Sequence, residues 1–210
     1  MKKILAIALF VIMLTPLRAN AFDWGSFFRW FFFGGETVQA LTTDEINTTV
    51  KDINEQVKTL DNSVQTDFLA VVPYLTTQKD ATNFESEFKK INASNAKDSD
   101  EQILKIISDY TTTIKSNKVG VLLILKTSSD IDKSALASKV KLLSENAQKY
   151  NELYKKGYNL TSKVTTTDDK EQTSAIENLN KTTESVKNKA EVIYAFASQV
   201  KTLASLAGIK

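Results

Sequence analysis

The chain has no cysteine and no histidine among its 210 residues. It therefore forms no disulfide, offers no thiolate nucleophile and lacks the commonest general base. The same two absences remove the usual ligands of zinc and other transition metals. We expect no metal site and no cofactor, and we predict that the protein is not an enzyme. A hydrolase built on paired carboxylates is the least favoured alternative, which the 25 acidic residues leave open.

Proline and glycine are also scarce. After residue 41 the breakers are Pro73, Gly120, Gly157 and Gly208. Such scarcity predicts long, uninterrupted helices. The three glycines stand far apart, so they form no phosphate-binding loop.

The chain also has no large excess of positive or of negative charge. The formal net charge is +2, but Lys2, Lys3 and Arg18 belong to the first 21 residues. Beyond them, basic and acidic residues nearly balance. No basic patch suited to a polyanion is evident, and we predict no nucleic-acid partner.

The N-terminus has the three parts of a secretory signal. Lys2 and Lys3 precede a continuous apolar run over residues 4–14, and Ala19 and Ala21 place small residues where a signal peptidase reads. The run is shorter than a bilayer-spanning helix. We predict a signal peptide over residues 1–21, cleaved after Ala21. The protein is then exported, to the periplasm, the cell surface or the medium.

The remainder shows helical periodicity with apolar residues at steps of three and four. The clearest stripes run from Ile46 to Val71 and from Ile176 to Val200, each over several heptads. This pattern predicts amphipathic helices with a coiled-coil-like seam. We place helices at about 43–72, 82–93, 99–127, 130–165 and 168–207. The expected fold is all-α: an elongated up-down four-helix bundle with a short extra helix, forming a domain over residues 42–210.

Helix-start signals stand before these stripes. The pairs are Thr42 with Glu45, Thr82 with Glu85, Ser99 with Gln102, Ser129 or Asp130 before the fourth helix, and Asp168 with Glu171. At the other end of the chain, Gly208 suits the position after the last helix.

Aromatic residues are most concentrated in one segment of the chain, residues 22–33. It holds both tryptophans and six of the eleven phenylalanines. Projected as a helix, Trp24, Phe27, Phe28 and Phe31 share one face. The predicted binding residues are Trp24, Phe27, Phe28, Arg29, Trp30, Phe31 and Phe32. Gly34 and Gly35 form a predicted hinge, so residues 22–41 are an amphipathic arm joined to the bundle.

Such an arm must bury its aromatic side chains in a membrane surface, in an apolar protein partner, or against its own bundle. Twelve helical residues would span about 18 Å, which suits lying in a membrane interface but not crossing a bilayer. The terminal position behind a glycine hinge, together with Trp and Arg, favours a lipid surface or another protein over self-packing.

Two further segments, 68–75 and 118–126, are apolar on all sides. The simpler interpretation is a buried waist of the bundle; the alternative is an element that emerges on activation. If such an element emerges on activation, the protein resembles the α-helical pore-forming toxins in architecture alone. A third hypothesis is a structural subunit or adhesin of a surface or secretion apparatus, which predicts a homo-oligomer.

Overall fold

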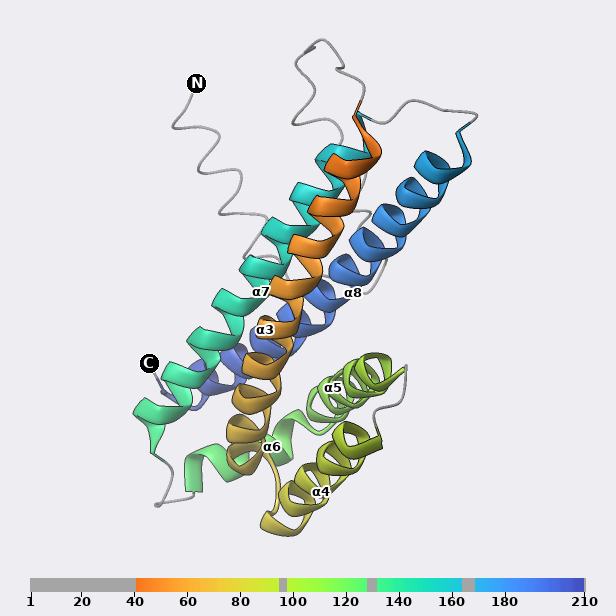
Figure 1. The fold of residues 1–210 in the computed structure, drawn as a ribbon. Coiled ribbons are helices and arrows are strands. Elements are labelled where there is room, and N and C mark those ends of the chain that lie inside the picture. The colour runs from red at the N-terminus through yellow and green to blue at the C-terminus, as the bar shows by residue number, and fades with distance from the viewer. Residues whose placement is uncertain (1–40, 95–97, 128–131, 164–168, 210) are drawn as a thin grey trace, which may run out of the picture. The chain divides into compact units, whose positions relative to one another are not determined.

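The protein is described by a computed structural model that covers residues 41–94, 98–127, 132–163 and 169–209. Within these ranges it forms helices and no strand, which confirms the all-α class. The helices are α3 (Thr43–Leu75), α4 (Gln78–Ser94), α5 (Ser99–Ser116), α6 (Lys118–Thr127), α7 (Lys133–Thr161) and α8 (Lys170–Leu206), shown in Figure 1.

Helix α3 begins at the predicted capping box. The Thr42 side chain accepts from the Glu45 backbone N–H at 3.2 Å, and the Glu45 carboxylate accepts from the Thr42 N–H at 2.8 Å. The helix runs past the predicted end at residue 72 and includes Pro73. Proline removes one backbone donor, but Leu75 beyond it is buried. Packing of the last turn therefore holds the helix to Leu75.

The middle of the chain differs from the prediction in two places. Helix α4 begins at Gln78 rather than 82, because the Thr77 hydroxyl accepts from the Asp80 N–H at 3.3 Å. The predicted single helix over 99–127 is two helices, with Asn117 between them at φ −99° and ψ 36°. Asparagine is a weak helix former because its side chain competes for backbone hydrogen bonds.

Three other helix ends can be compared with the predicted signals. Asp98, not Ser99, precedes α5; Asp132 caps α7, and Asp169 caps α8. Helix α5 begins at Ser99 as predicted, and the Asp98 side chain makes no capping hydrogen bond. Helices α7 and α8 begin at Lys133 and Lys170, three and two residues after the predicted starts, because the side chains of Asp132 and Asp169 accept from backbone N–H groups there. The end of α8 agrees with the prediction. Gly208 has φ of 80°, and the Ile209 N–H donates to the Ala204 carbonyl at 2.9 Å, as in a Schellman motif.

The three longest described helices, α3, α7 and α8, pack on one another. Their polar contacts fix the directions. Lys139 contacts Asp67 near the start of α7, whereas Lys156 near its end contacts Asp52. Helix α7 is therefore antiparallel to α3. Leu41 meets Gln172, and Phe68 meets Phe196, so α8 runs parallel to α3. Figure 1 shows this alternation.

Helix α4 packs against α3 and α5, α5 packs against α8, and α6 packs against α3 and α8. Five aromatic rings join four helices there: Phe68 stacks on Phe88 at 5.4 Å between centroids and lies edge-on to Tyr110 at 5.8 Å. Phe84 and Phe196 complete this aromatic cluster. Such ring pairs stabilise a core beyond their buried area.

The core has two parts. The larger includes the aromatic cluster and most of the predicted stripe residues of α3, α7 and α8. The smaller consists of Ile46, Val50, Ala175 and Leu179, near the starts of α3 and α8. Among the described helices, α5 and α6 take the place of the long helix predicted over 99–127, and α4 corresponds to the short extra helix predicted over 82–93.

Candidate functional site

The predicted binding residues Trp24, Phe27, Phe28, Arg29, Trp30, Phe31 and Phe32, and the hinge Gly34 and Gly35, lie outside the described residues. The point where this arm joins the helical unit is described. Leu41 packs against the smaller core, and its carbonyl accepts from Gln172 Nε2 at 2.8 Å. The arm therefore leaves from a point tied to the beginnings of both α3 and α8.

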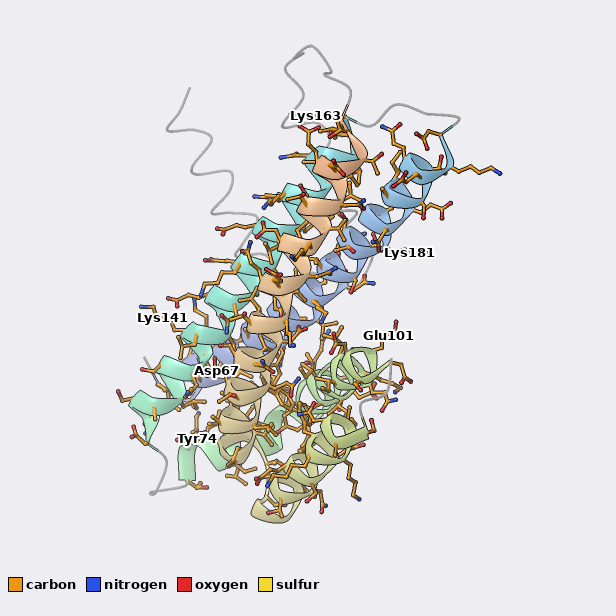
Figure 2. All side chains as sticks on the ribbon, in the orientation of Figure 1. Asp67, Tyr74, Glu101, Lys141, Lys163 and Lys181 are labelled. Atoms are coloured by element: carbon orange, nitrogen blue, oxygen red, sulfur yellow. The ribbon has the colours of Figure 1, made fainter. Side chains whose placement is uncertain are left out.

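The surface near Leu41 is polar. A shallow groove of about 390 Å³ lies between the first turns of α3 and α8. Asn47, Glu171, Ser174 and Lys181 contribute to its lining, with Ala175 as its apolar member. Figure 2 shows Lys181 projecting outward from α8. Aromatic side chains gain little in such a groove, because carboxylate and ammonium groups there would lose water.

The large apolar side chains exposed in the described ranges lie elsewhere. They are Val119, Leu123, Leu142, Tyr194 and Leu206. Leu142 on α7 lies between Lys139 and Asn146, both of which contact Asp67. Leu142 is therefore level with Asp67, which follows Leu41 by 26 residues. At the rise of a helix, this separation is about 39 Å along α3.

The linker from the arm is shorter than that distance. Eight residue steps separate Phe33 from Leu41, and a fully extended chain of this length spans at most about 28 Å. The linker alone therefore does not extend from Leu41 to the level of Leu142.

Helix α6 corrects the prediction of a buried waist over 118–126. Val121 and Leu125 are buried, but Val119 is 81% exposed and Leu123 is 62% exposed. The segment is apolar on all sides because the buried face of α6 and its exposed face both carry apolar side chains. The other segment, 68–75, agrees with the prediction in part: Phe68, Val71, Val72 and Leu75 are buried, but Pro73 is exposed and the other three residues are half-buried.

A cluster of ionisable side chains is buried where α3, α5, α7 and α8 meet. Lys189 of α8 is 3% exposed, and its Nζ lies 2.6 Å from Asp61 Oδ2 and 2.9 Å from Asp100 Oδ2. The Tyr150 hydroxyl donates to the other Asp61 oxygen at 2.6 Å. The buried ammonium thus has two carboxylate partners, which is what makes its burial tolerable.

A second buried carboxylate, Asp67, follows Asp61 by six residues on α3 (Figure 2). Lys139 Nζ lies 3.0 Å from its Oδ1, and Asn146 Nδ2 lies 3.4 Å from its Oδ2 and 3.1 Å from the Ser63 hydroxyl. These contacts join α3 to α7. Lys141, two residues from Lys139, instead projects to the outside (Figure 2).

Burial dominates the electrostatics of the Lys189 cluster. It raises the pKa of the Asp61 carboxyl, against the lowering effects of Lys189 and of the Tyr150 hydroxyl. Burial, followed by the charge of Asp61, also raises the pKa of Tyr150. Tyr150 therefore stays protonated and remains a hydrogen-bond donor at physiological pH.

The geometry of this cluster is that of a structural contact, which holds four helices together. The cavity beside it measures about 10 Å³, enough for about one water molecule. Within the described ranges no group of acidic side chains is arranged to hold a metal ion. Among the described helices none is both long enough and apolar enough to cross a bilayer.

Sequence reasoning missed this cluster, although a signal existed. Lys189 follows Val186 by three residues and precedes Ile193 by four, so it falls within the apolar stripe of its helix. Asp61 follows Val57 by four residues and precedes Val64 by three, so it too falls within an apolar stripe. Charged residues at such positions indicate a buried pair, but a single sequence does not say which charges meet.

Comparisons with protein-family models, with curated proteins and with solved structures find no match to this chain.

Proposed function

We propose that this chain is an exported, non-enzymatic helical protein that attaches through residues 22–33 to a membrane surface or to an apolar protein partner. The helical unit is then an up-down bundle of α3, α7 and α8, with α5 in a fourth position over part of its length. The aromatic arm is its attachment element, joined at Leu41.

One observation carries this proposal. The groove near Leu41, where the arm joins, is polar, and the exposed Leu142 lies level with a point about 39 Å further along α3. The described surface next to Leu41 therefore offers little apolar area for aromatic side chains to cover.

The energetics favour burial elsewhere. Burying the side chains of Trp24, Phe27, Phe28 and Phe31 gains roughly 2 kcal/mol each before ordering costs. Trp and Arg are well suited to the boundary between water and lipid, where one end of the side chain stays hydrated. We therefore expect the attachment to be reversible rather than permanent.

A non-enzymatic role agrees with the geometry of the charged residues. Lys189, Asp61 and Tyr150 bond to one another, and the space beside them holds no substrate. Enzymes ordinarily place such groups in a concave pocket of several hundred Å³.

Flotation with liposomes tests the proposal. The chain beginning at Phe22 is compared with a variant that carries Ser at positions 24, 27, 28 and 31. With vesicles of phosphatidylcholine alone, we expect the parent to float and the variant to remain at the bottom of the gradient. A matched control replaces Leu142, an exposed apolar residue of α7, by Ser and should float like the parent.

Other outcomes separate the alternatives. Equal flotation of parent and arm variant, or of neither, contradicts the membrane version. Self-association without lipid that is lost in the arm variant indicates a protein partner, here another copy of the chain. Release of a dye enclosed in the vesicles would favour a pore-forming role over simple attachment.

A further inference from the structure

Helix α6 presents an apolar face that the helical unit does not cover. Its buried side, with Val121 and Leu125, faces the core, while Val119 and Leu123 project away from it. At 100° per residue these two residues lie 40° apart on the outward side, and Lys126 falls beside Val119. Leu122 and Ile124 are half-buried at the edges of this face.

The charge of α6 is of one sign. Lys118 and Lys126 are both exposed, and the sequence of the helix from 118 to 127 contains no Asp or Glu. Short helices with an apolar outward face and lysines at its margins lie in the interface of anionic bilayers. The lysine stems extend along apolar surface while their ammonium groups reach the phosphates.

Other occupants of this face fit less well. The arm is a distant candidate along the chain, because α6 packs near the end of α3 and the arm joins at Leu41, before its start. A second copy would bring Lys118 and Lys126 against the same lysines, and like charges repel.

Area gives a further argument against a protein occupant. Full burial of a Val and a Leu side chain removes roughly 200 Å² from water. A stable protein interface needs about 800 Å² on each partner. A lipid surface needs no such area, because it adapts its shape to a few inserted side chains and adds attraction for each lysine.

We propose that the outward face of α6, formed by Val119, Leu123 and Lys126, is a second membrane contact that selects anionic lipid. The face does not depend on the aromatic arm for its structure, since α6 packs on α3, α5 and α8. It lies at the other end of α3 from the arm's attachment at Leu41.

A single-tryptophan reporter tests this contact directly. Both tryptophans of the chain, Trp24 and Trp30, belong to the arm, so Trp24→Phe and Trp30→Phe remove the background while the arm stays aromatic. Leu123→Trp then places the reporter at a site that is 62% exposed. Leu142→Trp, at a site on α7 that is 41% exposed, is the matched control.

Vesicles of phosphatidylcholine with phosphatidylglycerol are compared with vesicles of phosphatidylcholine alone, both containing brominated acyl chains as quenchers. We expect the reporter at position 123 to shift to the blue and to be quenched only with phosphatidylglycerol, and the reporter at 142 to stay unchanged. No change at 123, or equal changes at 123 and 142, would overturn the assignment.

Two variants separate this contact from the arm. With Ser at positions 24, 27, 28 and 31, the reporter at 123 should still respond, at a higher vesicle concentration. Val119→Ser with Leu123→Ser should weaken binding of the full chain to phosphatidylglycerol vesicles at least tenfold, with an unchanged circular dichroism spectrum.

The two proposals therefore fail in different experiments. Loss of flotation in the arm variant, with no response at 123 and no effect of the α6 substitutions, rejects the α6 contact and keeps the arm. Lipid-free self-association that is abolished by Val119→Ser and Leu123→Ser, without any effect on vesicle binding, makes the face a contact between copies and rejects the lipid assignment.

Discussion

Gly157 on α7 lies so close to Thr183 on α8 that a Cβ at position 157 would stand 2.3 Å from Thr183 Oγ1. Both residues are buried, and the Thr183 hydroxyl has no hydrogen-bond partner among the described residues. Glycine therefore permits the close approach of the two helices here. The cost of glycine inside a helix, about 1 kcal/mol relative to alanine, is offset by this packing.

Gly157→Ala is expected to destabilise the protein by about 1–2 kcal/mol, because overpacking of a core outweighs the gain in helix propensity. The Thr183 side chain cannot rotate freely to make room, since a β-branched residue in a helix is stiff at χ1. The free energy of unfolding in urea measures the effect.

The same substitution should cost much less once Thr183 is shortened. In a Thr183→Ala background the Oγ1 and Cγ2 atoms are gone and the nearest remaining atom, Cβ, stands 3.3 Å away. That contact is still tight, so the gain of about 1 kcal/mol in helix propensity should offset most of the remaining cost. Equal effects in both backgrounds would show that the two residues do not interact.

The two carboxylates around Lys189 should differ in their importance. Asp61→Asn leaves a buried ammonium with one partner fewer, and losses of about 3 kcal/mol are usual when a buried pair is broken. Asp100→Asn should cost less than about 1 kcal/mol, because the Asp100 side chain is 59% exposed and water can replace it. Thermal or urea unfolding of the two variants ranks them; a larger loss for Asp100→Asn would contradict this account of the cluster.

Asp52 gives a prediction for pH. Its hydrogen bond with Lys156 of α7, supported by Gln56, lowers the pKa of the Asp52 carboxyl below the usual 3.8. A lowered pKa in the folded state contributes stability above the unfolded-state pKa, and that stability is lost as pH falls through the folded-state pKa.

Asp52→Asn should therefore be less stable than the parent at neutral pH, and the difference should shrink at about pH 2. Urea midpoints at the two pH values provide the comparison. Asp44→Asn, a change at another acidic residue of α3, is the control. A difference that grows on acidification would have the wrong sign for this pair.

Tryptophan fluorescence without lipid tests whether the arm packs on the bundle. Both tryptophans lie at positions 24 and 30, so the emission of the unmodified chain reports on the arm alone. Since the described groove near Leu41 is polar, we expect the emission of water-exposed tryptophan and ready quenching by iodide. A blue-shifted, protected emission from a monomer would remove the main support for attachment through the arm.

The apolar stripes were predictable because helical packing repeats at the period of the helix. Every stripe residue of α3 from Ile46 to Val71 is buried, as expected. In α8 the prediction is confirmed for most positions, although Ile176 and Ala190 are half-buried. Local periodicity carries this information, so no knowledge of the partner helix is needed.

What covers a given apolar face could not be predicted in the same way. The run over 118–126 was expected to be buried, yet Val119 and Leu123 are exposed because no described helix lies on that side. The break at Asn117 turns α6 away from the line of α5, a change that the apolar pattern does not encode. The arm itself stays a prediction.

The hydrogen bond between Gln172 and the Leu41 carbonyl has a mechanical consequence. A force applied to the arm enters the unit at the first turns of α3 and α8 together, and these helices run in the same direction. The load is thus shared by two helices side by side. The interface that resists it first is the smaller core of Ile46, Val50, Ala175 and Leu179, while the aromatic cluster lies further from the point of traction.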